Sequence, residues 1–440
     1  MKLGKYYLDL SRMNFLFKIV LIFIFISSIN ESRANTLFDS LKSAYLNNPK
    51  LNAERANMRA SREEKRESVS EFLPSVTISG YISDQENTKT GGSDSNFKPS
   101  EQAMIVEQKI FQGGSGVASF LKKKHGQSIG EFKLKKVEQE ILLEAAKAHT
   151  ELLLNRKKVN INLMNIDLLE RQVETDQNRL ERGEINLTDL AQSESSLAGA
   201  TAALITAQND LVTSRTNFER IIGKKPTENI KEIKEINLNL PESLAAAYRV
   251  SNSENPDLQI ALLEFEKSKL DVIIAGSDLS PYATLSYKIA EQDNISATVT
   301  DRTQQTVSAT ATWPLFSGGS NIFNLRKARE LRNQKELLFQ DSKKKSETDV
   351  AKAWSNYQSS KGVLESIRSQ VKAAEIANEG ITLEYESGNS RTTLEVIQSR
   401  SILLNSRINL ASSERNFLIS QFNLLAVVGQ LTATHLNFKK

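Results

Sequence analysis

The sequence has no cysteine and only three histidines among its 440 residues. The missing cysteine excludes disulfides, thiol chemistry and lipid attachment through a cysteine. His125, His149 and His435 lie too far apart in the sequence to suggest a metal cluster. The 57 basic and 53 acidic residues nearly balance, so no nucleic-acid partner is expected. No motif pairs a nucleophile with a base, so we predict no enzyme, no cofactor and no metal.

Long apolar runs are also missing beyond the N-terminus. The run Ile19–Ile26 follows a basic residue, is too short to span a bilayer, and is followed by small residues. We interpret residues 1–34 as a signal peptide and Asn35 as the mature start, with Met13 as an alternative initiator. Because no later segment has about 18 consecutive apolar residues, no transmembrane helix is predicted. The mature chain could enter a membrane only as a closed barrel.

Four segments alternate apolar and polar residues, as strands with one apolar face do. The clearest segment, Gln305–Leu315, has apolar residues at the odd positions from Val307, with serine or threonine at the even positions up to Thr312. The other three are Val76–Ser83, Ala103–Phe111 and Ala283–Ala290. We expect residues 84–100, between the first two strands, to form a solvated loop.

The remainder of the chain has helical periodicity. Residues 36–71 form one continuous helical pattern, and Pro74 follows it. Two much longer patterns run from Gly114 to Gly183 and from Gly319 to Gly388, with apolar residues at heptad spacing. About 70 helical residues reach roughly 100 Å, which suits a structure that bridges a wide aqueous gap.

The second half of the sequence repeats the first, which indicates gene duplication. Asn48-Pro49 recurs 207 residues later, and the turn glycine Gly183 recurs 205 residues later as Gly388. The glycine pairs after the strands also recur, and we predict a strand-to-helix bend at each of them: Gly113, Gly114, Gly318 and Gly319. We divide the mature chain into repeats 35–223 and 241–429, a connector 224–240 and a tail 430–440.

Four strands are too few for a membrane barrel, which needs at least about eight and has no open edge. Several copies must therefore combine. Two, three or four copies would give eight, twelve or sixteen strands, and physical reasoning alone leaves this number open.

Over nearly all of its mature length the chain resembles the TolC family of outer-membrane efflux and secretion channels. The matching features are the following, in order: Asn48-Pro49, Leu73-Pro74, Phe111 to Gly114, Gly183, Asn255-Pro256, Ser280-Pro281, Phe316 to Gly319 and Gly388. The resemblance implies a mainly α fold with β structure. Three copies would share a twelve-stranded outer-membrane β-barrel, four strands per chain, continued by a long periplasmic α-helical barrel.

The resemblance also implies where function lies. A gate latch at the helix tips would consist of Thr188, Asp189, Tyr385 and Arg391, with Asp189 accepting from Tyr385 and Arg391. Glu395 would form a pore constriction, and Gln398 stands at the second constriction position without a charge. We therefore expect a pore that still prefers cations but is blocked by cations more weakly. The turns with Gly183, Gly388 and Asn389 would dock an adaptor. The turn after Gly388 carries one residue more than the family pattern.

The implied function is a passive exit duct of a tripartite efflux pump or a type I secretion system. Its partners would be a periplasmic adaptor (membrane fusion) protein, an inner-membrane transporter of RND, ABC or MFS type, and outer-membrane lipid of a Gram-negative bacterium. The sequence does not distinguish drugs from polypeptides as cargo. A periplasmic coiled-coil scaffold without a pore is the alternative, but it would leave the four alternating segments unexplained.

Overall fold

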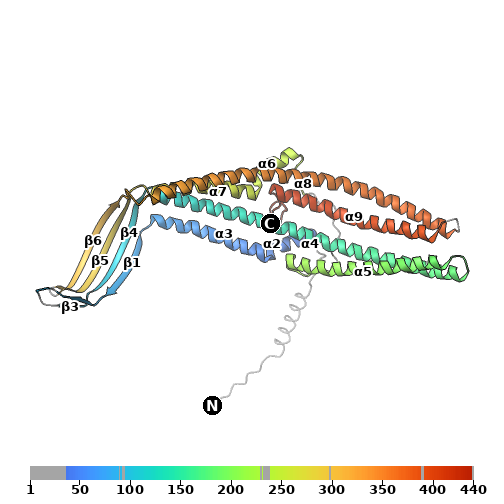
Figure 1. Cartoon of the computed structure of the whole chain (residues 1–440), viewed down its shortest axis with the longest axis horizontal. Helices are drawn as coiled ribbons and strands as arrows, with labels where there is room; N and C mark the ends of the chain where they lie inside the picture. Colours follow the sequence, from blue (N-terminus) through green and yellow to red (C-terminus); the bar gives the residue numbers. More distant parts are fainter. Residues whose placement is uncertain are drawn as a thin grey trace, which may run out of the picture.

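The computed structural model describes residues 36–88, 90–91, 95–227, 230, 238–296, 299–387 and 391–438. The predicted signal peptide, most of the connector and the turn residues Gly388 and Asn389 lie outside these ranges. The described chain is long and narrow, with a sheet at one end and paired helices at the other (Figure 1).

The sheet is antiparallel, in the order β1-β4-β5-β6, so each repeat contributes one pair of neighbours. Its strands are β1 Ser75–Ile82, β4 Ser100–Gln112, β5 Tyr282–Ser296 and β6 Val299–Thr312. This confirms the four predicted strands, although β5 is longer than predicted and β6 ends three residues before Leu315. Strands β1 and β6 are the two edges of the sheet, and neither has a second neighbour in the described chain.

The pairing register gives the sheet one apolar and one polar face. Directly paired residues share a face, and Ile78 pairs with Met104, Met104 with Ile289, and Tyr287 with Val307. The opposite face pairs Ser286 with Ser308, whose hydroxyls lie 2.7 Å apart. On that polar face Lys288 forms an ion pair with Glu101 at 2.6 Å. Both faces are largely exposed in the single chain.

The helices of the two repeats match in order and, except for α3 and α7, in length. They are α2 Leu37–Asn47, α3 Pro49–Glu67, α4 Ser115–Glu181 and α5 Leu187–Ile222 in the first repeat, and α6 Leu244–Glu254, α7 Pro256–Ser277, α8 Ser320–Glu386 and α9 Thr393–Val428 in the second. Both α4 and α8 have 67 residues, and both α5 and α9 have 36. No described helix is both long and apolar enough to cross a membrane.

Gly114 and Gly319 are the N-cap residues of α4 and α8, and both adopt left-handed backbone conformations. Their φ angles of 90° and 83° are ones that a side chain at Cβ disfavours, so glycine suits these bends between strand and helix. Gly113 and Gly318, which precede them, also have positive φ.

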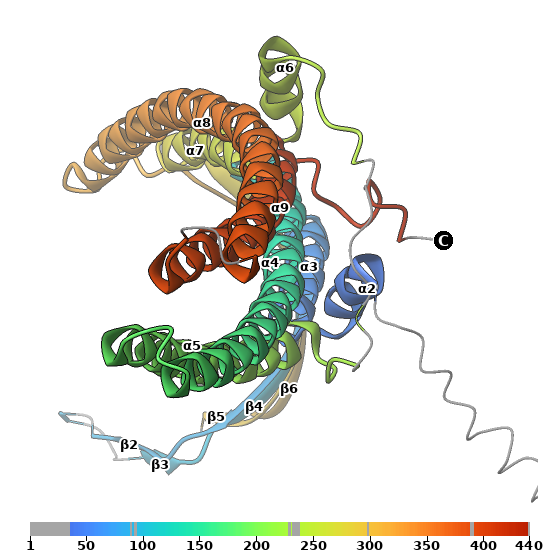
Figure 2. The same cartoon turned by 90° about the vertical axis from the view of Figure 1, so that its right-hand side faces the viewer.

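The helices form a curved wall. At the tip end α4 packs between α5 and α9, and α8 packs on the far side of α9. At the sheet end α4 packs between α3 and α7, and α8 lies beside α7. Seen from the tip end, α5, α4, α9 and α8 form an arc, with α2, α6 and the C-terminus on its outer side (Figure 2). One side of α8 and one side of α3 and α5 therefore have no neighbour among the described elements.

The apolar core lies midway along the wall, where α2 and the C-terminal residues pack onto α4, α5 and α9. Its fully buried side chains include Leu41, Leu142, Phe218, Phe422 and Leu431. Buried Leu431 and Leu436 show that the predicted tail, residues 430–440, contributes to this core.

Two sequence predictions are corrected by the structure. The pattern over residues 36–71 is two helices and a 3-10 turn, because Pro49 cannot donate a hydrogen bond and starts a new helix after Asn48. The predicted loop 84–100 contains a short ribbon, β2 Gln85–Asn87 paired with β3 Ser95–Phe97. Three-residue strands are too short to produce a visible alternation.

Candidate functional site

The tips of the two helical hairpins are joined by a buried carboxylate, Asp176. Its side chain is completely buried near the end of α4. Gln172 Nε2 donates to Oδ1 at 2.9 Å, and the Tyr385 hydroxyl donates to the same oxygen at 3.0 Å. The Ser193 hydroxyl on α5 donates to Oδ2. A carboxylate with three donors can remain buried, because hydrogen bonds replace the water that it lost.

Tyr385 extends this network to the next hairpin. Its hydroxyl lies 3.1 Å from that of Thr393 at the start of α9, so one phenol links α8, α9 and α4. The Arg179 guanidinium stacks over the Tyr385 ring at 4.8 Å from the centroid. We call Asp176, Tyr385, Ser193 and Thr393 the Asp176 clasp.

Arg400 on α9 adds a second link between the hairpins. Its guanidinium donates to Gln172 Oε1 at 3.2 Å and to the Leu168 carbonyl at 3.4 Å, both on α4. Burial lowers the pKa of Arg400, while nearby Glu386, Asp176 and Tyr385 act in the opposite direction. The positive charge therefore lies in a partly dry seam, where hydrogen bonds to it are stronger than in water.

The hydrogen bonds predicted for Asp189 do not form within the chain. Asp189 belongs to a capping box with Asn186 at the start of α5, and it accepts from the Asn186 backbone N–H at 3.3 Å. Tyr385 bonds to Asp176 instead, because a helical side chain points toward the N-terminus of its helix and so away from the tip. Thr188 is exposed at the first turn of α5.

Arg391 also has partners other than the predicted one. Its guanidinium bonds to Glu384 at 2.6 Å and to Glu395 at 3.1 Å, across the turn between α8 and α9. Glu395 in turn accepts from the Thr392 backbone N–H at 2.8 Å as the N3 residue of a capping box. The Thr392 backbone and the Arg391 side chain lower the pKa of Glu395.

Glu395 thus has a structural role that would be present with or without a pore. Gln398, one turn further along α9, is exposed.

Gly183 has a φ of +74° with open space around its Cα, as suits a tight turn at a helix end. Helices α4 and α8 end 205 residues apart, whereas α5 and α9 start 206 apart, so the second turn is one residue longer than the first.

The seams between the helices consist of small residues at strict heptad spacing. They are Ser193, Ala200, Ala207 and Ser214 on α5, and Ser399, Ser406, Ser413 and Ser420 on α9, all of them buried. A period of seven imposes a left-handed supercoil, and small side chains let neighbouring backbones approach closely. Helices α5 and α9 therefore contribute mainly small side chains to these coiled-coil seams, whereas α8 contributes larger ones such as Leu364 and Val371.

A second set of polar contacts, made by asparagine side chains between helix ends, explains the recurring Asn-Pro pairs. The side-chain oxygen Oδ1 of Asn255 caps α7 by accepting from the backbone N–H groups of Asp257 and Leu258, at 2.9 and 3.2 Å. Its amide nitrogen donates to the Val427 carbonyl in the last turn of α9, at 2.9 Å. Asn48 forms the same bridge, capping α3 and donating to the Ile221 carbonyl at 3.0 Å. Each asparagine thus joins two helices end to end.

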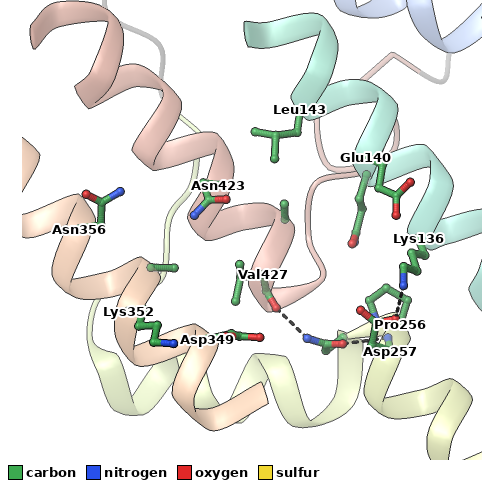
Figure 3. A pocket seen from close by; sticks show the side chains of 14 residues that line it. Lys136, Glu140, Leu143, Pro256, Asp257, Asp349, Lys352, Asn356, Asn423 and Val427 are labelled. Atoms are coloured by element: carbon green, nitrogen blue, oxygen red, sulfur yellow. Dashed lines mark hydrogen bonds and ion pairs between the residues drawn. The ribbon is translucent and has the colours of Figure 1, made fainter. Parts of the chain in front are cut away.

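A niche of about 570 Å³ opens beside the α9–α7 joint (Figure 3). Lys136 from α4 forms an ion pair with Asp257 at 2.7 Å on one side of it, and Asp349 and Lys352 from α8 lie on the other. Helix α6 packs against Val350 and Trp354, on a different side of α8 from Lys352. The niche therefore lies on the opposite side of the wall from α6.

Asp176, Arg400 and the joint function of Asn255 were not predicted from the sequence. A signal for Asp176 exists: Asn155, Asn162, Leu169 and Asp176 follow one another at intervals of seven, and all are buried. A carboxylate on the buried stripe of a coiled coil must have partners. The Asn-Pro pairs were noticed as repeat markers, but their bridging role requires the neighbouring helix ends to be known.

Comparison with known proteins decides the family. A sequence model described as "Outer membrane efflux protein" matches residues 40–224 and again residues 247–430. The chain belongs to the outer membrane efflux protein family. Its double match coincides with the internal repeat, and membership places the chain in the outer membrane of a Gram-negative bacterium as an efflux channel protein.

Individual relatives match over nearly the full chain. The outer membrane efflux protein BepC of Brucella suis is 25% identical over 411 residues, covering 92% of this chain and 88% of BepC. Outer membrane protein TolC of Escherichia coli is 21% identical, covering 91% and 83%. The CmeC outer membrane channel of Campylobacter jejuni superposes with a TM-score of 0.81 at 13% identity, covering 90% of this chain and 86% of CmeC. The last similarity shows a common fold.

Proposed function

We propose that three copies of this chain form a closed exit duct, with one shared twelve-stranded barrel in the outer membrane and a helical barrel below it in the periplasm. The observation that carries the proposal is the two-faced sheet at the end of a curved helical wall. Its apolar face suits lipid, and its polar face, with Lys288 and Glu101, suits water.

The unpartnered edges support ring closure. An open sheet edge exposes unpaired backbone groups, which is unfavourable in lipid, so β1 and β6 need neighbours. Exposed apolar side chains such as Ile205 and Val212 on α5 and Ile376 and Leu383 on α8 lie seven residues apart. Neighbouring copies would bury these stripes as heptad seams.

In this proposal the duct is passive. A periplasmic adaptor binds the turns at Gly183, Gly388 and Asn389, and an inner-membrane transporter of the RND, ABC or MFS class supplies the energy. The cargo is a small molecule or a polypeptide, as the transporter dictates. The names of the relatives, an efflux protein in BepC and an efflux channel family as a whole, favour efflux over secretion.

We further infer that the Asp176 clasp holds the α8–α9 hairpin against the α4–α5 hairpin and so restrains opening at the tip. Thr188, Asp189 and Arg391 remain candidates for contacts between copies, because they lie at the same end of the molecule. Glu395 and Gln398 are proposed to line the constriction that the hairpins close. With Glu395 as its one acidic position, the constriction would prefer cations but would be blocked by them more weakly.

Single-channel recording in planar bilayers tests both the duct and its gate. Tyr385→Phe removes the hydroxyl that joins α4, α8 and α9 without removing the ring, so we expect conductance to increase several-fold. Tyr287→Phe is the matched control, since its hydroxyl bonds only to Gln305, on the sheet. A purified protein that forms no channel would contradict the proposed duct. Equal conductance of Tyr385→Phe and wild type would contradict only the proposed role of the Asp176 clasp in the gate.

A further inference from the structure

The first turns of α8 carry three exposed cations that have no acidic partner in the part of the chain that the structure describes. Arg326, Lys327 and Arg329 are exposed and follow the start of α8 at Ser320 by six, seven and nine residues. Helix α8 begins beside the sheet (Figure 1). Within the described chain no carboxylate lies within 4 Å of their charged groups. Glu330 is the one acid between residues 320 and 335, and it accepts from Asn333. The cluster therefore keeps a net positive charge.

The duplicated half of the chain provides an internal comparison. Lys122 in α4 corresponds to Lys327 in α8, 205 residues later. Lys122 is paired with Asp271 at 2.5 Å, and its neighbour Lys123 with Glu64 at 3.2 Å. Two of the three consecutive lysines on α4 are therefore paired, whereas exposed Lys124, which corresponds to Arg329, forms no ion pair within the described chain. On α8 none of the three cations is paired within the described residues. Their role on α8 is thus not explained by packing within the chain.

Exposed apolar side chains precede these cations in the chain. Trp313, Leu315, Phe316 and Phe323 are 62%, 80%, 86% and 64% exposed. Trp313 continues the apolar face of β6, and its indole N–H donates to the Leu279 carbonyl at 3.1 Å. The Arg326 guanidinium lies 5.9 Å from the Phe323 ring centroid. Aromatic residues followed by cations are typical of the boundary between bilayer core and headgroups.

The cations lie more than one headgroup-layer thickness along the helix from the start of α8, and their long side chains can span the difference. Arg326 and Arg329 follow the start of α8 at Ser320 by six and nine residues, or about 10 to 14 Å of helix. Each headgroup layer is about 5 to 8 Å thick, and long basic side chains extend several ångströms toward it. If the apolar face of the sheet ends in the bilayer core, the guanidinium and ammonium groups reach the phosphates.

We propose that Arg326, Lys327 and Arg329 bind the phosphate of an anionic phospholipid in the leaflet that faces the helices, while Trp313, Phe316 and Phe323 contact its acyl chains. This proposal rests on the proposed insertion of the sheet into the outer membrane. Guanidinium groups suit the site because they bind phosphate oxygens in pairs. The site gives the duct a fixed depth and a preference for charged lipid around its base.

A second copy of the chain is the competing occupant. The free side of α8 would face α3 of a neighbouring copy, and α3 carries exposed Glu63 and Glu67. Ion pairs between copies would use the same cations without any lipid, so the experiment must measure lipid binding and assembly separately.

The test uses the full mature protein in detergent, titrated with phosphatidylglycerol or phosphatidylcholine and observed by native mass spectrometry. The variant is Arg326→Gln, Lys327→Gln and Arg329→Gln combined. Its matched control is Lys361→Gln, Arg368→Gln and Lys372→Gln, which removes three exposed cations from the distant half of the same helix. We expect about a hundredfold weaker phosphatidylglycerol binding in the variant, unchanged phosphatidylcholine binding and a control like wild type.

Other results would overturn the proposal. Equal phosphatidylglycerol binding by variant and wild type would remove the cations from any lipid site. Loss of the oligomer with unchanged lipid binding per chain would assign them to the contact between copies. Binding by wild type that does not weaken between about 0.05 M and 0.5 M salt would also contradict it, because screening must reduce a phosphate contact at an exposed site. Failure of the wild type to enter bilayers of either lipid would instead reject the proposed function.

Discussion

His149 shows how the core of the wall depends on one uncharged side chain. It is completely buried in α4, where Nδ1 lies 2.9 Å from the Ser40 hydroxyl and Nε2 has no partner in the described chain. Its ring lies 6.1 Å from that of Phe218. Burial lowers the pKa of His149 to about 4, and Asp39, the charged neighbour from α2, opposes this shift. The folded core therefore holds the neutral imidazole.

This geometry predicts a loss of stability in mild acid. The pKa of His149 is lower in the folded state than the ordinary value of 6.5, so the unfolded chain binds the proton first as pH falls. The free energy of unfolding should be unaffected above pH 6.5 and fall by on the order of 3 kcal/mol by pH 4. Urea unfolding of wild type and His149→Gln at several pH values measures the effect.

The variant should lose stability at pH 7.5 but show a flatter dependence between pH 6.5 and 4. His435→Gln is the control, because His435 is only partly buried and bonds to the Leu238 carbonyl at 3.0 Å. Parallel pH curves for wild type and His149→Gln would mean that the acid sensitivity arises elsewhere.

At the scale of elements, the asparagine joints determine which helices are stacked end to end. The sequence predicts the strands, the long helices and the repeat, because these follow from periodicity over many residues. It did not predict the break at Asn48 within residues 36–71, since one proline at the start of a helix leaves the apolar pattern intact. Nor could it show that α9 continues into α7, because the joined ends lie about 170 residues apart in the chain.

The joint at Asn255 leads to a stability prediction. Asn255→Asp keeps an oxygen to cap α7 but places a carboxylate against the Val427 carbonyl, so it should lower the free energy of unfolding by about 2 kcal/mol. Ser243→Asp is the control, because the Ser243 hydroxyl only caps α6, by accepting from Ala246, and aspartate performs that role equally well.

Thermal or urea unfolding of both variants in the same detergent checks the prediction. Equal stability of Asn255→Asp and wild type would show that the amide donor contributes nothing to the joint. Gly429 closes the same joint from the α9 side: a Cβ there would lie only 2.7 Å from the Asn255 nitrogen, so the two helix ends are in direct contact.

The gate at the helix tips stays a prediction, but within the described chain the Tyr385 hydroxyl donates to Asp176 and not to Asp189. Sequence spacing places Asp189 and Tyr385 near the two turns, and both are there. Which carboxylate receives the phenol depends on the direction of the tyrosine side chain and on how far α4 and α8 are offset. A heptad pattern fixes neither the direction of the side chain nor the offset. Sliding one helix along another moves all residues of its apolar stripe by the same distance and leaves the pattern unchanged.

At the scale of the whole molecule, the chain is a segment of a wall. Its curvature, its two open strand edges and the free sides of α8 and α5 all require neighbours, and identical copies meet this need with one type of contact repeated around a ring. The number of copies depends on the angle that each segment spans. The family resemblance favours three, whereas strand counting allows two or four as well.

Because the chain has no cysteine, engineered disulfides can count the copies without background. Alternating strand directions make β6 of one copy antiparallel to β1 of the next. We predict that Ser79→Cys, combined in turn with cysteine at Gln304, Thr306 or Ser308 on the same polar face, forms interchain disulfides for at least one pair. Non-reducing gels should show a ladder that ends at three chains.

Val307→Cys with Ser79→Cys is the control, because Val307 lies on the apolar face and should not crosslink. A ladder that ends at two or four chains would give a barrel of eight or sixteen strands, and an absence of ladder from all three pairs would mean that β1 and β6 do not meet between copies.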